Sequence, residues 1–280
     1  MKKISRRSFL AAAAVSAAAL ALTACGGSAS TASSAAASSV AASSEAASTS
    51  AAAAELTTVE AGKLTMATNA AFPPYEMTTD AGEFEGIDIE TAQAIADKLG
   101  LELQIDDMDF DAALLSVQQG KADIVMAGVT VTDERKAVMD FSDSYATGIQ
   151  SIIVPEGSDI ASPDDLAGKK IGTQRGTTGY IYCSDDFGDD SVVAYDDGLT
   201  AVQALNNGQV DAVVIDNAPA KEFVAANPGL VILDTSYAEE DYAIGMAKGS
   251  SLEDAVNAAL EELKADGTLQ SIVDKYITAE

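Results

Sequence analysis

The chain has 280 residues and a strongly acidic composition, with 44 Asp and Glu against 16 Lys and Arg and a formal charge of −28. Nucleic-acid binding through phosphates requires clusters of Lys and Arg, and the absence of a suitable cluster excludes that class. The sequence also has no histidine, which excludes histidine metal ligands and the Ser-His and Cys-His pairs of nucleophilic enzymes.

Residues 1–24 are predicted to be a lipoprotein signal peptide. Four basic residues lie within the first seven, and the apolar run at 9–22 that follows is short for a permanent membrane span. The next residues, Leu22-Thr23-Ala24-Cys25, resemble the lipobox of bacterial lipoproteins, in which the cysteine becomes lipidated. An uncleaved anchor is the alternative. The segment "SRRSFL" resembles a twin-arginine signal, and general secretion stays open as a second route.

Residues 25–55 are predicted to form a flexible tether, because Ala, Ser, Thr and Gly dominate and no apolar periodicity is present. Without the leader, 12 Lys and Arg face 44 Asp and Glu, a formal charge of −32. An anionic membrane surface would repel such a chain, so we expect lipid on Cys25 to hold it at the outer face of the cell membrane. Lipidation would leave Cys183 alone, without an intrachain disulfide.

From residue 56 onward, short apolar strands alternate with amphipathic helices. In the first series, the pattern predicts strands at 63–69, 101–106 and 122–128 and helices at 86–100 and 109–120. Such alternation is typical of βαβ units and a mostly parallel sheet.

The alternation restarts in the second half of the chain. Strands are predicted at 148–158, 169–174, 191–196, 210–216, 229–234 and 241–250. Helices are predicted to begin at 177 and to span 198–209, 217–227, 252–265 and 268–276. Two similar series indicate two lobes. The acidic segment "DDFGDD" lacks the ligand spacing of a calcium loop, and we expect neither a metal nor a cofactor.

Each half contains a helix, a glycine, a turn, an aspartate and an apolar strand, in "AALLSVQQGKADIVMAG" and "TAVQALNNGQVDAVVID". The second strand ends at Asp216, and the first leads to Arg135. Open α/β sheets bind ligands beyond the carboxyl ends of their strands, so an anionic and a cationic group there suit a zwitterion. A surface salt bridge is the alternative for Arg135, and a helix N-cap is the alternative for Asp216.

These residues resemble the bacterial extracellular solute-binding proteins of family 3, which serve polar amino-acid ABC importers. The similarity begins at "GIDIETAQAIA", where Thr91 replaces the usual apolar residue, and is dense over "MDFDAALLSVQQGKADIVMAGVTVTDERKAVMDFSDSY". The segments "QRGTTG", "VDAVVIDNAPA" and "YAIGMAKGSSLEDAVNAALEELKADGTLQSIVDKY" follow in the order of the family. The resemblance covers nearly the whole chain after the tether.

The resemblance implies an α/β, two-lobed periplasmic-binding-protein-like fold of type II. Two mixed sheets with flanking helices would be joined by two hinge strands, with the ligand between the lobes. Lobe 1 would comprise residues 56–147 plus 243–280, and lobe 2 would comprise residues 148–242. The two crossings would lie in "SYATGIQ" and "AEEDYAI".

The resemblance also implies how the backbone groups of an amino acid are held. Arg135 would bind the α-carboxylate, because a guanidinium forms paired hydrogen bonds to a carboxylate, and Thr130 and Thr178 would assist it. Asp216 and Gly128 would receive the α-ammonium group. At Gly128 the absence of a side chain would let the main chain approach the ligand.

Four further residues would contact the ligand side chain in this resemblance. Phe72 and Phe110 match aromatic walls, although core packing is the default for any phenylalanine. Asn69 replaces the acid of many relatives, and Gln174 stands where a glutamine-binding relative has lysine. These neutral residues favour a glutamine-like ligand. Cationic amino acids come second because the acidic field attracts them, and dicarboxylic ones are disfavoured because Arg175 is the only nearby extra base.

We therefore expect a monomer without enzymatic activity that captures a free amino acid and delivers it to a separate ABC permease. An enzyme on the same fold, such as a dehydratase, is one alternative, and an extracellular amino-acid sensor domain is another. The retained Asp216 argues against the enzyme, because the zwitterion site is then unaltered.

Overall fold

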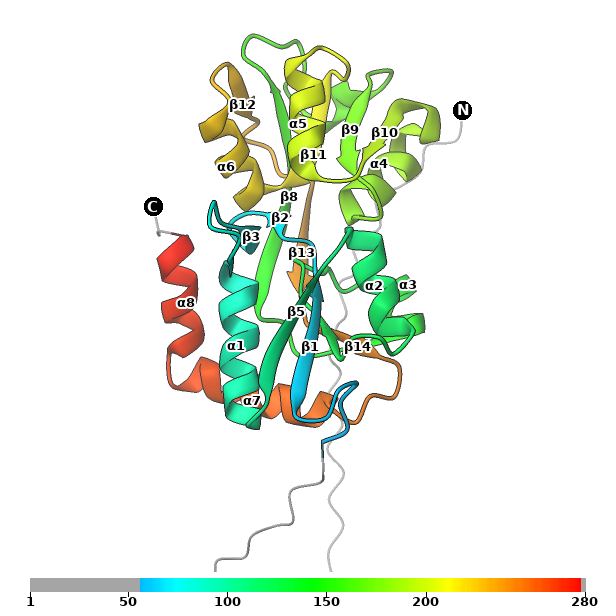
Figure 1. Cartoon of the computed structure of the whole chain (residues 1–280). Helices are drawn as coiled ribbons and strands as arrows, with labels where there is room; N and C mark the ends of the chain where they lie inside the picture. Colours follow the sequence, from blue (N-terminus) through cyan, green and yellow to red (C-terminus); the bar gives the residue numbers. More distant parts are fainter. Residues whose placement is uncertain (1–55, 278–280) are drawn as a thin grey trace, which may run out of the picture. The chain divides into compact units, whose positions relative to one another are not determined.

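Two sheets organise residues 56–277, the part of the chain that this computed structural model describes (Figure 1). The sheet of lobe 1 has the order β5-β1-β6-β14-β7. Its strands are β1 (Lys63–Thr68), β5 (Glu102–Asp107), β6 (Ile124–Val125), β7 (Met139–Phe141) and β14 (Gly245–Ala247). Strands β5, β1 and β6 are parallel, whereas β14 is antiparallel to both neighbours, so the sheet is mixed.

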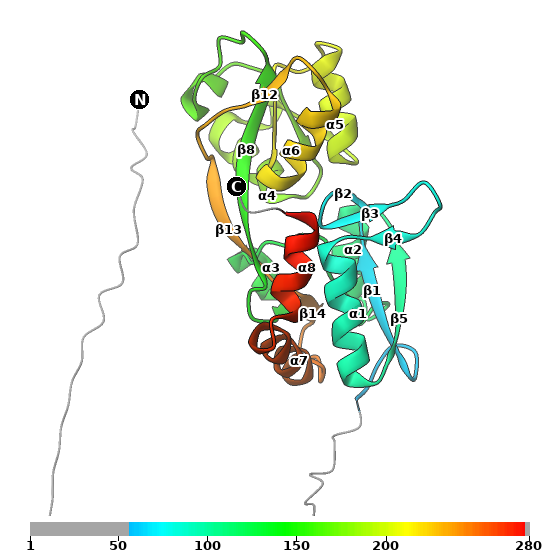
Figure 2. The same cartoon turned by 90° about the vertical axis from the view of Figure 1, so that its left-hand side faces the viewer.

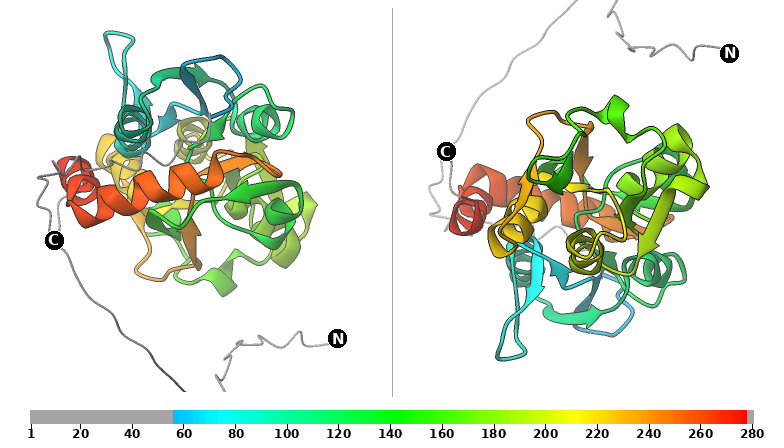
Figure 3. Two further views of the ribbon diagram at one scale, coloured as in Figure 1. Left: turned by 90° about the horizontal axis from the view of Figure 1, so that it is seen from below. Right: turned by 90° about the horizontal axis from the view of Figure 1, so that it is seen from above.

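Helices cover both faces of this sheet, which explains why its strands have nearly continuous apolar runs. The helices of lobe 1 are α1 (Ile87–Leu99), α2 (Phe110–Gln118), α3 (Asp133–Val138), α7 (Glu253–Ala265) and α8 (Thr268–Tyr276). Leu64 and Met66 of β1 belong to the core beneath α1 and α7, whereas Ala67 packs with Ala113 and Val117 of α2. Seen from below, α7 crosses the lower side of the lobe (Figure 3).

A small antiparallel sheet of β2 (Ala71–Phe72), β3 (Glu76–Thr78) and β4 (Phe84–Glu85) was not predicted from the sequence. It lies at the upper end of α1 (Figure 2). Gly86 joins it to α1 at a φ of 129°, and a Cβ there would lie 2.2 Å from the Tyr75 carbonyl oxygen. Only glycine fits this approach, which fixes β3 against the helix.

The sheet of lobe 2 has the order β10-β9-β11-β8-β12, and β13 pairs with β8 beside this path. Its strands are β8 (Ala146–Pro155), β9 (Ile171–Gln174), β10 (Val192–Tyr195), β11 (Ala212–Asp216), β12 (Leu230–Ile232) and β13 (Ala238–Tyr242). Its helices are α4 (Thr178–Phe187), α5 (Gly198–Asn206) and α6 (Asn217–Ala226), with short 3₁₀ turns at Pro163–Leu166 and Asp189–Ser191. Along β11, Val214 packs with Cys183 of α4 and Val213 belongs to the core with Phe223 of α6.

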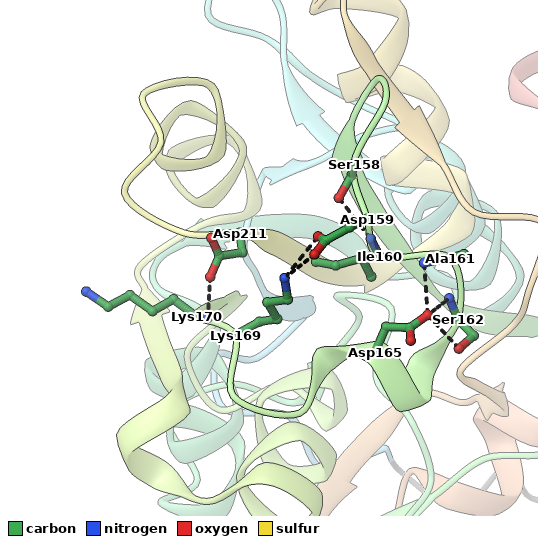
Figure 4. Close-up of polar contacts among 9 residues, drawn as sticks. All are labelled: Ser158, Asp159, Ile160, Ala161, Ser162, Asp165, Lys169, Lys170 and Asp211. Carbon is green, nitrogen blue, oxygen red and sulfur yellow. Dashed lines mark hydrogen bonds and ion pairs between the residues drawn. The ribbon is translucent and has the colours of Figure 1, made fainter.

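The turn between β8 and β9 is held by its own side chains (Figure 4). Asp165 accepts hydrogen bonds from the backbone N–H groups of Ala161 and Ser162, which fixes the 3₁₀ turn at Pro163–Leu166. Lys169 pairs with Asp159 at 2.9 Å. These residues lie outside the lining of the pocket described below.

The two lobes are connected by β8 and β13, which run antiparallel with Ala146 opposite Tyr242 and Ala238 opposite Gln150 (Figure 2). The prediction of one strand at 241–250 was wrong. The chain leaves β8 of lobe 2 after Tyr242 and joins β6 and β7 of lobe 1 at Gly245, so two strands with different partners replace it. The strand predicted at 122–128 is confined to Ile124–Val125.

Candidate functional site

The candidate site is a narrow pocket between the two lobes. It is lined by Asn69, Phe72, Glu76, Phe110, Ala127, Gly128, Thr130, Arg135, Gln174, Thr177, Thr178 and Asp216. The structure thus brings together all nine residues that the sequence marked as ligand contacts, and their roles toward a ligand stay predictions. Cys25 lies outside the described residues.

Arg135 lies on α3 and is buried, with 8% of its surface exposed. Thr132 caps α3, and its hydroxyl accepts from the Arg135 N–H at 3.1 Å. The guanidinium donates to the carbonyl oxygen of Thr130 at 2.8 Å, within lobe 1, and to that of Gly176 at 3.0 Å, which joins lobe 1 to lobe 2. Its carbon lies 5.4 Å from the centre of the Phe110 ring. A guanidinium has five N–H donors, so donors remain for an anionic group.

Asp216 ends β11 and is buried. Its carboxylate accepts from Gln150 Nε2 at 2.7 Å and from the Tyr242 hydroxyl. Burial raises the pKa of Asp216 to about 6; the hydrogen bond from Tyr242 partly offsets this rise, and repulsion by Glu240 adds to it. Although Asp216 holds the N-cap position of α6, its side chain makes no capping hydrogen bond. The carboxylate is therefore directed to the pocket rather than to the helix.

Glu240 of β13 is a buried acid that the sequence analysis missed. One carboxylate oxygen accepts from the Thr178 hydroxyl at 2.8 Å and from Gln150 Nε2 at 3.1 Å, and the Thr130 hydroxyl lies 3.3 Å from it. The other oxygen accepts from the Tyr182 hydroxyl at 2.7 Å. Glu240 thus links residues from both lobes. The hydroxyls of Thr130 and Thr178 bond to this carboxylate, and the carbonyl of Thr130 accepts from Arg135.

The amide side chains of Asn69 and Gln174 bond to each other across the lobes. Gln174 Nε2 donates to Asn69 Oδ1 at 2.8 Å, and Asn69 Nδ2 donates to the Met108 carbonyl at 2.9 Å. Both side chains are buried. This end of the pocket is therefore neutral and already ordered by hydrogen bonds.

Phe72 and Phe110 are buried on the lobe 1 side of the pocket. Gly128 has a φ of 56°, and a Cβ there would lie 3.0 Å from the Phe72 ring and 3.2 Å from the Tyr242 ring. Glycine therefore allows the rings to approach the backbone after β6. The aromatic side of the pocket therefore adjoins the backbone that follows β6.

Glu76 of β3 also lines the pocket and was missed by the sequence analysis. It is fully buried, and burial followed by the nearby Asp88 carboxylate raises its pKa well above the usual range. The stretch "YEMTTD" contains other polar residues, so nothing in its pattern distinguished Glu76 from a solvated acid.

Within residues 56–277 there is no group of three or more His, Cys, Asp or Glu residues arranged to hold a metal ion. None of the helices in this same range is long and apolar enough to cross a membrane. Cys183 is buried, and burial raises the pKa of its thiol to about 12, so the thiolate is disfavoured.

Comparison with known proteins adds an independent line of evidence. Residues 64–279 match the family model of bacterial extracellular solute-binding proteins, family 3. The L-cystine-binding protein TcyJ of Escherichia coli K12 is 33% identical over 226 residues, covering 79% of this chain and 85% of that protein.

Solved structures are similar as well. The arginine-, lysine-, histidine-binding protein ArtJ of Geobacillus stearothermophilus has a TM-score of 0.75 and 34% identity, covering 78% of this chain and 96% of that one. An ancestral arginine-binding protein bound to glutamine has a TM-score of 0.74 and 42% identity, covering 78% of this chain and 99% of that one.

Proposed function

This chain belongs to family 3 of the bacterial extracellular solute-binding proteins, and we propose that it captures a free polar amino acid between its lobes for an ABC importer. The family and the compared proteins are solute-binding proteins and not enzymes, so the enzyme considered from the sequence is set aside. The observation that carries the proposal is one pocket lined by a buried guanidinium and a buried carboxylate from different lobes.

The proposed contacts follow from the donors and acceptors of the lining. Arg135 binds the α-carboxylate with the N–H groups that the carbonyls of Thr130 and Gly176 leave over. Asp216, with the Gly128 backbone, binds the α-ammonium. Thr130 and Thr178 are held by Glu240 and therefore shape the carboxylate end. Burial of both ligand charges against partners avoids the cost of a lone buried charge.

The ligand side chain is proposed to lie against Phe72 and Phe110 and to reach Asn69 and Gln174. The two amides favour a neutral, glutamine-like side chain, and a cationic side chain is the second candidate. Glu76 supports that second candidate because a buried carboxylate is stabilised by a positive charge.

We propose that ligand capture closes the lobes by bending at β8 and β13, with lobe 1 at 56–147 plus 243–280 and lobe 2 at 148–242. The closed protein, as a monomer, then docks on a separate permease. Residues 1–24 would be removed as a signal peptide. Lipid on Cys25 and the tether at 25–55 would anchor the protein to the outer face of the cell membrane. All of these N-terminal residues lie outside the described range.

A thermal-shift screen against the common amino acids tests this function, after unfolding and refolding to remove any carried-over ligand. At one hundred times the dissociation constant, a ligand stabilises the folded protein by about 2.7 kcal/mol, which gives a measurable rise in Tm. We expect a rise with one or a few amino acids that Arg135→Ala abolishes. Arg175→Ala is the matched control, because Arg175 is exposed and lies outside the pocket lining. No rise with any amino acid would contradict the proposal.

A further inference from the structure

Glu76 lacks a hydrogen-bond donor, unlike the other buried acids of the described residues. No donor in the range 56–277 reaches either of its carboxylate oxygens. Asp123, by comparison, accepts from the backbone N–H groups of Val59 at 2.7 Å and Thr65 at 2.8 Å. The remaining buried acids, Asp88, Asp216 and Glu240, also accept hydrogen bonds. An ionised carboxylate without a donor is costly to bury, so Glu76 requires either a proton or a cation.

The groups that face Glu76 supply no positive charge. They are Asp88 on α1, Asp107 at the end of β5, Asp216 at the end of β11, and the phenols of Tyr75 and Tyr145. Arg135 is the basic residue of the pocket lining, and its charge is balanced by other acids, first among them Glu240. A positive charge beside Glu76 must therefore come with the ligand.

A proton shared with Asp88 is the alternative to a ligand cation beside Glu76. In Asp88, Oδ2 accepts from the Gly128 N–H at 3.0 Å and from the Tyr145 hydroxyl at 2.8 Å. Its Oδ1 has no donor in the described part of the chain. The Asp88 carboxylate is a neighbour that raises the pKa of Glu76, and two neighbouring carboxylates bond to each other only if one carries a proton. Burial raises the pKa of Asp88 to about 6, which favours one proton on the pair.

Building on the proposed capture of an amino acid, we propose that Glu76 selects the charge of the ligand side chain through its own protonation. When Glu76 shares a proton with Asp88, the pocket takes a neutral side chain. When Glu76 is ionised, the pocket takes a cationic one. Binding of a cationic amino acid therefore releases a proton that binding of a neutral one retains. Neutral and cationic ligands would thus bind to two different protonation states of the same site.

L-arginine and L-citrulline provide a matched test, because they have nearly the same shape and differ in a guanidinium or a neutral urea. Both carry the same α-carboxylate and α-ammonium, so titration of Asp216 affects them alike. Isothermal titration calorimetry from pH 5.5 to 8.5 measures both dissociation constants. We expect the preference for arginine to rise with pH, by up to about tenfold per pH unit where Glu76 titrates. Titrations in two buffers of different ionisation enthalpy should show more protons released with arginine.

The variant Glu76→Gln keeps the shape of the side chain and resembles its protonated form. We expect it to bind citrulline as the wild type does at low pH, with a preference that no longer changes with pH and no extra proton release. Glu83→Gln is the matched control, because it removes one negative charge from the exposed connection between β3 and β4. It should behave as the wild type. If Glu76→Gln did not fold, the wild-type pH series would still decide.

The outcomes separate this proposal from the proposed function. A pH-independent preference in the wild type would overturn the role of Glu76. An equal loss of both ligands in Glu76→Gln would do the same, because Glu76 would then serve the α-ammonium. Binding of other amino acids but neither of these two would also overturn it and leave amino-acid capture standing. No binding of any amino acid would instead contradict the proposed function.

Discussion

Asp216, the proposed partner of the ligand ammonium, is buried at a cost to the stability of the folded protein. Its carboxylate is buried beside Glu240, and the Gln150 amide and the Tyr242 hydroxyl only partly offset the burial. Such a group gains from an incoming ammonium, which supplies the missing positive charge. We therefore expect the ligand-free folded protein to be less stable at neutral pH than at mildly acidic pH.

The Asp216→Asn variant tests this expectation through the pH dependence of stability. Burial raises the folded-state pKa of Asp216 to about 6 from 3.8, so between these values the folded protein binds more protons than the unfolded chain. The free energy of unfolding then falls as pH rises through this window, by at most on the order of 3 kcal/mol for this group. Urea denaturation of ligand-free protein at pH 4.5 and 7 should show a smaller difference in the variant. Equal differences in both proteins would contradict the argument.

At the scale of elements, the strand ends and helix starts carry the site. Asn69, Gln174 and Asp216 lie at or just beyond the ends of β1, β9 and β11, whereas Thr178 begins α4. Arg135 depends on the short helix α3, whose N-cap is Thr132. Because α3 has only six residues, its geometry relies on this cap more than that of a long helix would.

Removal of the cap should therefore affect binding as well as stability. Thr132→Ala loses the hydrogen bond from the Arg135 N–H, which costs about 1 kcal/mol. We expect a lower Tm and weaker amino-acid binding, measured by calorimetry with the ligand that the screen identifies. Thr132→Ser keeps the hydroxyl and should restore both. A variant with lower Tm but unchanged affinity would show that α3 does not set the position of Arg135.

The sequence predicted the long elements well because each carries its own periodic pattern, as in α1, α5 and α7. The small sheet β2–β4 could not be predicted, since its strands have two or three residues and depend on Gly86 fitting against Tyr75. Arg135 and Asp216 were marked as candidates because each lies beyond an apolar strand and matches the family resemblance. Glu76 and Glu240 were missed because their segments contain other acids, and burial is decided only by neighbours distant in the sequence.

At the scale of the whole described molecule, the pocket is closed by contacts that cross between lobes. Gln174 bonds to Asn69, Arg135 bonds to the Gly176 carbonyl, and Glu240 of β13 accepts from hydroxyls of both lobes. These contacts are polar and few, so a ligand can alter the balance between open and closed lobes by a modest difference in affinity.

Gly148 on β8 is a point where this closure tolerates little added volume. An added Cβ would lie 2.5 Å from the Tyr242 ring and 2.7 Å from Asp216 Oδ1, so Gly148→Ala must displace these side chains, of which Asp216 lines the pocket. Overpacking of this kind costs about 1–3 kcal/mol. Since the contact joins the end of β11 to β13, we expect about tenfold or greater loss of affinity and a smaller ligand-induced compaction in small-angle X-ray scattering. Ile149→Ala, at the neighbouring and 39% exposed position, is the control. Wild-type affinity in Gly148→Ala would show that Tyr242 and Asp216 need not keep their contact for the lobes to close on the ligand.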